Sequence, residues 1–281
     1  MELMHIYFIT ISMDTNVLEL FEYEFMQRAF LAGIIIAVLA SVSGTFIVLR
    51  RYSMISETLA HSALVGVAVG LVAGYNPLWM AVIVAIISAW TIEYLRDHFS
   101  LYSDAILAIM LSGSLAIAVI IVSLGGAFNN SLFSYLFGSI LSVTKEDVIT
   151  IFIFGSLALG VLLLYAKELY FIAYDEEVAK VSGIRVKLLN YLLVTVVAII
   201  IALSIRVVGS LLIGALMVIP TIAALQFKLG FFKTSLLSLL FAILSVVSGM
   251  ILSYHFSLPS GATIVLSVLS IFILSLIVSK K

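Results

Sequence analysis

Long apolar runs alternate with short polar segments along most of the chain. The runs are about twenty residues long, the length that an α-helix needs to cross the roughly 30 Å hydrocarbon core of a bilayer. They predict an all-α polytopic membrane protein with about nine transmembrane helices, eight to ten being compatible with the pattern. The predicted spans are Met26–Leu49, Thr58–Ala73, Leu78–Tyr94, Ala105–Leu124, Val148–Tyr165, Leu188–Ile205, Val207–Leu225, Ser235–Tyr254 and Gly261–Val278.

Two segments depart from this pattern. Leu132–Val143 is apolar but too short to cross a bilayer, so we expect a re-entrant or interfacial helix there. Residues 1–25 mix apolar and acidic side chains and lack the basic start and cleavage site of a signal peptide. They predict a short interfacial segment outside the membrane, followed by a single transmembrane domain over residues 26–281.

The Lys and Arg residues predict the orientation, because basic residues near span ends stay on the cytoplasmic side. An external N-terminus places 11 of the 14 basic residues in the cytoplasm and leaves Arg28, Lys145 and Arg206 outside. The opposite orientation reverses that ratio. We therefore expect an external N-terminus and a cytoplasmic C-terminus, with Arg206 at a tight external turn where its side chain snorkels to the lipid headgroups.

Composition supports the membrane assignment and narrows the chemistry. The 281 residues are 64% hydrophobic and 10% charged, with a mean hydropathy of +1.30, which a soluble domain of this length would not show. A net charge of −1 argues against a nucleic-acid partner. Because the chain has no cysteine, any metal must be held by nitrogen and oxygen ligands.

The clearest candidate metal ligands are Glu57 and His61. They lie four residues apart, so on a helix both side chains share one face and can reach one ion. The alternative is a solvated Glu57 near the helix start and a buried His61 bonded to backbone. His255, beside Tyr254 at the external end of a span, is a weaker candidate whose alternative is a wetted interfacial histidine.

Small residues mark two predicted helix surfaces. The second span carries a small-xxx-small series suited to close helix packing, and the seventh span combines small residues with an internal proline that would bend it. The alternatives for the seventh span are a packing seam and a flexible wall of a translocation path. The residues are Gly66, Gly70 and Gly74 in the second span, and Ser210, Gly214 and Pro220 in the seventh.

The cytoplasmic loop over residues 166–187 predicts a short amphipathic helix. It contains an N-cap, acidic residues for the first turn, two apolar residues and a glycine stop. Such a helix is either an unpartnered surface element or docks into a groove on a soluble subunit. The residues are Asp175, Glu176, Glu177, Val178, Val181 and Gly183.

The sequence carries no motif for hydrolysis. It has no phosphate-binding Walker loop, no His-Glu-x-x-His and no Gly-x-Ser-x-Gly, so we do not expect an enzyme. Energy for transport must come from a soluble ATPase at the cytoplasmic loop or from an ion gradient. The second source is weaker, because Glu57 is the only acid predicted to act inside the membrane.

Several stretches together resemble a known family. They are Phe25–Ala29, Val48–Arg51, Ile55–Gly66, Tyr135–Leu141, Ala173–Ala179, Ser182–Gly183, Arg206–Leu212, Ala215–Pro220 and Leu258–Thr263. In order and spacing this set resembles the zinc/manganese/iron ABC permeases, the membrane subunits of bacterial divalent-metal importers. The resemblance covers about Phe25 to Val278.

This resemblance implies a homodimer of permeases in the bacterial plasma membrane. Its partners would be a cytoplasmic ATP-binding subunit, which holds the ATP, and an extracytoplasmic metal-binding protein. The divalent ion would be cargo, with no permanently bound cofactor. Asp175–Gly183 would be the coupling helix that meets the ATPase. Glu57 stands where the family usually has Asp, and Ser257 replaces another usual Asp, for which His255 is the candidate substitute.

Two rival functions remain open from the sequence. A permease for a chelated metal, such as a siderophore or corrinoid, would need a broad apolar cavity in place of the Glu57/His61 pair. An ion-coupled secondary carrier would work without any ATPase.

Overall fold

The computed structural model describes residues 22–99, 102–125 and 130–279, and within these ranges every regular element is helical. The predicted interfacial segment 1–25 lies outside the described residues except for its last four. The elements are α2 (Glu24–Leu49), α3 (Met54–Ala73), α4 (Pro77–His98), α5 (Ser103–Leu124), α6 (Asn130–Phe137), the 3₁₀ turn η2 (Ile140–Ser142), α7 (Lys145–Leu164), α8 (Ala166–Tyr174), α9 (Glu176–Val181), α10 (Val186–Val208), α11 (Ile213–Leu225), α12 (Phe231–Phe256) and α13 (Ser260–Ser279).

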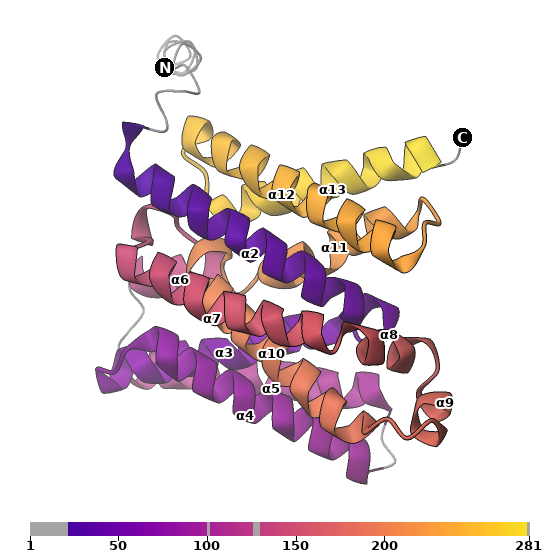
Figure 1. Ribbon diagram of the computed structural model, residues 1–281. Helices are drawn as coiled ribbons and strands as arrows, with labels where there is room; N and C mark the ends of the chain where they lie inside the picture. The colour runs from indigo at the N-terminus through magenta and orange to yellow at the C-terminus, as the bar shows by residue number, and fades with distance from the viewer. Residues whose placement is uncertain (1–21, 100–101, 126–129, 280–281) are drawn as a thin grey trace.

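Eight of these helices are long and apolar enough to cross a membrane, and they lie side by side in one bundle (Figure 1). The most buried are α2, α3 and α10, while large apolar side chains of α4, α5 and α7 remain exposed on the outside. The short segment Leu132–Val143 forms α6 and η2. With eight residues α6 is about 12 Å long and cannot span a bilayer, as predicted.

The predicted span Val207–Leu225 is wrong as a continuous helix. Residues 207 and 208 still belong to α10, and α11 begins only at Ile213 with 13 residues, about 20 Å. In between, Gly209 adopts φ +90°, and Ser210 N and Leu211 N donate to Tyr135 O and Leu136 O of α6. Because α6 satisfies these donors, the chain leaves the helical path there without losing hydrogen bonds.

Contacts between distant segments define two ends of the bundle. At one end, which we call the α6 end, Arg206 of α10 pairs with Asp147 of α7, and Ser260 Oγ of α13 donates to Val207 O. At the other, the α9 end, Phe231 of α12 stacks near Phe46 of α2 and Tyr170 of α8. Helix α2 therefore begins at the α6 end, whereas α13 finishes at the α9 end (Figure 1).

Glycines allow the closest backbone contacts. A Cβ on Gly66 would lie 2.3 Å from Met80 O, and one on Gly70 would lie 2.7 Å from Pro77 Cα, so these two residues form the predicted packing seam against α4. The prediction that Gly74 continues this seam is wrong. Gly74 has φ +74° and no neighbour there, because it ends α3 in the left-handed conformation.

Three further glycines allow close backbone contacts at the α6 end. A Cβ on Gly138 would lie 2.4 Å from Val207 O, one on Gly209 would lie 2.5 Å from Leu136 O, and one on Gly261 would lie 2.0 Å from Val208 O. Three stretches that are far apart in sequence therefore meet backbone to backbone. This junction holds the start of the non-helical segment before α11 in place.

Candidate metal path and coupling surface

Glu57 lies in the first turn of α3 and borders a cavity of about 260 Å³ between α3 and α11. Its side chain is exposed. Gly214 faces it from α11, since a Cβ there would lie 3.5 Å from Glu57 Cβ and 3.4 Å from Ser56 Oγ. The cavity wall is completed by Ser53, Met54, Leu211, Ala215, Val218 and Ile219. Glu57 is the only charged residue of this wall.

His61 lies one turn further along α3 and is 6% exposed. Its Nδ1 atom is buried and has no hydrogen-bond partner in the described part of the chain. A buried imidazole nitrogen normally has a hydrogen-bond partner, so this one is unusual. No backbone group of the described residues forms a hydrogen bond with this nitrogen.

The face of α3 that carries Glu57 is the face least covered by the rest of the chain. On this side of the helix the less buried positions form one stripe, which the buried His61 interrupts. They are Met54, Glu57, Val65, Val69 and Val72. Among the described residues, no group of three or more His, Asp or Glu side chains lies close enough together to hold an ion.

His255 does not join this pair. It lies in the last turn of α12 at the α6 end, where Nδ1 lies 3.1 Å from Ile251 O and the ring lies edge-on to Tyr254. Ser257 follows with φ +52° and borders a separate cavity of about 350 Å³ that also includes Tyr254. No residue lines both this cavity and the one beside Glu57.

The α11 segment is anchored on two sides by polar contacts. Thr221 Oγ1 lies 2.9 Å from Ser238 Oγ, to which Ser41 Oγ donates at 3.2 Å, so α11 is linked to α12 and α2. Pro220 is buried inside α11, and Ser210 before the helix is 1% exposed with an unpartnered hydroxyl. These positions pack tightly rather than lining open space.

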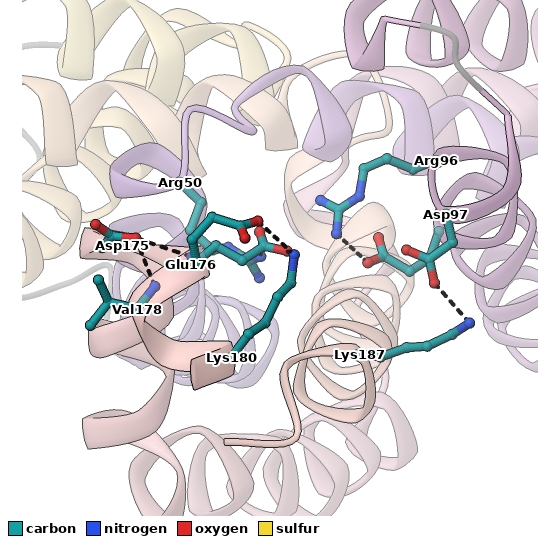
Figure 2. Close-up of polar contacts among 10 residues, drawn as sticks. Arg50, Arg96, Asp97, Asp175, Glu176, Val178, Lys180 and Lys187 are labelled. Atoms are coloured by element: carbon teal, nitrogen blue, oxygen red, sulfur yellow. Dashed lines mark hydrogen bonds and ion pairs between the residues drawn. The ribbon is translucent and has the colours of Figure 1, made fainter. Parts of the chain in front are cut away.

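The predicted amphipathic helix of the 166–187 loop exists as α9. Asp175 caps it, its Oδ1 accepting hydrogen bonds from Glu177 N and Val178 N at 3.0 Å each (Figure 2). Gly183 follows with φ +83°. Val178 is 48% exposed and Val181 is 90% exposed, so α9 presents two apolar side chains that nothing in the described chain covers.

One ion pair links α9 to the turn between α2 and α3, and a second lies within α9. Arg50 Nη2 lies 3.6 Å from Glu176 Oε2, and Lys180 lies 3.4 Å from Glu176 Oε1 (Figure 2). The same turn contacts α4, because the Arg96 guanidinium lies 5.1 Å from the centre of the Tyr52 ring. Burial raises the pKa of Tyr52 to about 12. This turn leads directly into the first turn of α3, where Glu57 lies.

Sequence reasoning missed two charged pairs. Arg206 does not snorkel: its Nη1 lies 2.6 Å from Asp147 Oδ1, a carboxylate that also accepts from Thr144 N. Glu93 is 1% exposed inside α4 and accepts a hydrogen bond from Arg96, so the predicted span Leu78–Tyr94 contains a buried acid that sequence reasoning left out. The Thr144–Asp147 capping box was the available local signal for the first pair.

Comparisons with known proteins agree with this architecture. The model of a family described as the ABC 3 transport family matches residues 22–279. The high-affinity zinc uptake system membrane protein ZnuB of Haemophilus influenzae is 31% identical over 90% of this chain and 97% of its own length. The manganese import system permease protein ScaB of Streptococcus gordonii is 29% identical, covering 93% and 94%.

A solved structure is also similar along almost the whole chain. It is PsaBC from Streptococcus pneumoniae in complex with Fab, with a TM-score of 0.82 and 28% sequence identity over 92% of this chain and 95% of that one. The helical arrangement described above is therefore shared with an experimentally determined protein.

Proposed function

The chain belongs to the ABC 3 transport family, and from this premise we propose how it works. It is the multi-pass permease subunit of an ATP-driven importer for divalent transition metals, zinc and manganese being the metals named for its relatives. It does not hydrolyse ATP, which is the task of a separate subunit. The metal is cargo, so it binds only transiently.

Glu57 and His61 are the proposed cargo ligands. The observation that carries this assignment is the free, buried Nδ1 of His61 one turn from a carboxylate that borders a cavity. Zn²⁺ accepts imidazole and carboxylate in a tetrahedral set, and Mn²⁺ takes a larger share of oxygen ligands. A transport site must also release its ion, which a site with few ligands from each chain allows.

A second copy of the chain completes the site in this proposal. Two chains that meet along the uncovered stripe of α3 would bring two Glu57/His61 pairs together and supply four ligands. This arrangement also covers Met54 and Val72, which are 49% and 43% exposed in the single chain. The homodimer thus explains both the incomplete ligand set and the exposed stripe.

The α9 end faces the cytoplasm in this proposal. The helices Ala166–Tyr174 and Glu176–Val181 lie there, together with most of the basic residues, as the positive-inside rule requires. Val178 and Val181 then dock into the ATP-binding subunit. The Arg50–Glu176 pair carries displacements of α9 to the turn before α3, and hence to Glu57. An extracytoplasmic protein delivers the metal at the α6 end.

Uptake by reconstituted vesicles tests the function. Vesicles carrying the permease, its ATP-binding subunit and its metal-binding protein should accumulate radioactive Zn²⁺ or Mn²⁺ on adding ATP. Excess free metal should compete, a chelated metal should not, and an ionophore should leave the initial rate unchanged. Uptake that needs a chelate, or that stops with the ionophore while ATP has no effect, would refute the proposal in favour of the two rivals.

A matched pair of histidine variants tests the ligands. His61→Ala should abolish uptake while assembly and ATP binding persist. His98→Ala should transport normally, because His98 stacks on Tyr94 at the exposed end of α4. His255→Ala tests separately whether His255, the weaker candidate ligand at the α6 end, is needed for uptake. Normal uptake by His61→Ala would remove this residue from the path.

A further inference from the structure

A third cavity, of about 370 Å³, lies at the α9 end and is rich in positive charge. Arg50 and Arg51 after α2 and Arg96 of α4 border it, with Glu176 as the one lining carboxylate. The last residues of α8 close the remaining side. The cavity is separate from the one beside Glu57.

Arg50 is the unusual member of this lining. Its side chain is only 6% exposed, yet none of its five N–H donors makes a hydrogen bond to the described residues. The nearest carboxylate oxygen, on Glu176, is 3.6 Å away, too far for a hydrogen bond. Burial, followed by the charge of Arg96, lowers the pKa of Arg50. A largely buried guanidinium that borders a cavity with one carboxylate in its lining has donors available to an anion inside the cavity.

The charged groups around Arg50 form no hydrogen bond with its guanidinium in the described part of the chain. Arg96 is already bonded to Glu93, and Glu176 is shared with Lys180 at 3.4 Å. Arg51 is exposed and forms no ion pair within the described ranges. Two guanidinium groups on consecutive residues therefore border one cavity with donors to spare.

We propose that this cavity binds a phosphate group between Arg50 and Arg51. A guanidinium donates two parallel hydrogen bonds to phosphate oxygens, and such charge-assisted bonds are the strong ones. The phosphate belongs either to an anionic phospholipid, because basic pockets between membrane helices at the cytoplasmic surface suit such headgroups, or to a soluble phosphate. The bound anion would lie beside Glu176, the first residue of α9, and would weaken its pairing with Arg50.

Two measurements distinguish a phospholipid from a soluble ligand as the source of the phosphate group. The full-length permease is purified from vesicles of phosphatidylglycerol and phosphatidylcholine, and retained lipid is measured by native mass spectrometry. In parallel, inorganic phosphate is titrated against the permease in pure phosphatidylcholine, with thermal stability as the readout. Retained phosphatidylglycerol alone identifies a lipid site, and saturable stabilisation by phosphate identifies a soluble ligand.

Two substitutions locate the site. Arg51→Gln changes an exposed residue and should reduce binding about tenfold. Arg50→Gln should abolish it, although burial makes this variant the more difficult to fold. Lys167→Gln is the control, because Lys167 is an exposed base on α8 that does not line the cavity. Binding of neither probe to the unmodified protein overturns the proposal, as does equal loss of binding in Arg51→Gln and Lys167→Gln.

Discussion

Replacing Gly44 by alanine tests whether the packing of α2 against α11 sets the geometry of the metal path. The added Cβ would lie 1.9 Å from Met217 O and 2.8 Å from Met217 C. Contacts of Cβ below 3.0 Å essentially never occur, so α11 and α2 must separate by at least 3.0 − 1.9 = 1.1 Å. The contact is with backbone, which no rotamer change can relieve.

This displacement reaches the candidate ligands. Met217 is three residues, about one turn, from Gly214, which faces Glu57 across the cavity. Overpacking of this kind costs about 1–3 kcal/mol. For a chain of this size such a loss corresponds to a decrease in melting temperature of about 2–12 °C. Because positioning errors of about 1 Å impair function strongly, we expect uptake to fall at least about tenfold.

Gly214→Ala is the matched control, on α11, the helix that Gly44 of α2 contacts. Its Cβ would meet Ser56 Oγ at 3.4 Å and Glu57 Cβ at 3.5 Å, which are ordinary contacts. This variant should fold with an unchanged melting temperature. Melting is measured in one detergent for both variants, and metal uptake is measured in vesicles. An unchanged melting temperature and uptake in Gly44→Ala, or equal damage in both variants, would refute the packing argument.

Three further predictions concern charged groups. Asp147→Ala leaves Arg206 without its partner and should cost about 2 kcal/mol, seen as a lower melting temperature; the double change Asp147→Ala/Arg206→Ala should recover part of it, and additive losses would contradict the pair. Tyr52, whose pKa burial raises from 10.0 to about 12, stays protonated in the fold while an unfolded tyrosine ionises near pH 10. Stability that is complete below pH 10 is therefore lost toward pH 12, and Tyr52→Phe should flatten this alkaline decline in a melting series; identical pH profiles would contradict it. Glu176→Gln should lower the metal transported per ATP hydrolysed, whereas Glu177→Gln, on the same helix but without contact to Arg50, should not; equal coupling ratios would remove the Arg50–Glu176 pair from the coupling path.

Local physical chemistry made much of this protein predictable from its sequence. The apolar runs predicted the membrane helices because the requirement for crossing a bilayer is local. A segment must be about twenty apolar residues long and must pair its own backbone groups in a helix. The position of α9 followed from Asp175 and Gly183, since a cap and a stop act on the adjacent turn. The spacing of Glu57 and His61 predicted that both lie on one helix, as they do in α3; their role as metal ligands stays a prediction.

Contacts between distant residues decided the rest. The break before α11 exists because backbone atoms of α6, distant in sequence, accept the hydrogen bonds of Ser210 and Leu211. Arg206 finds Asp147, 59 residues away, and the burial of Glu93 depends on how α4 packs. The unpartnered Nδ1 of His61 and the burial of the Arg50 side chain beside Glu176 are likewise visible only once all neighbours are placed. The physical reason is that propensity and capping act within a turn or two, whereas burial and pairing depend on which helices lie side by side.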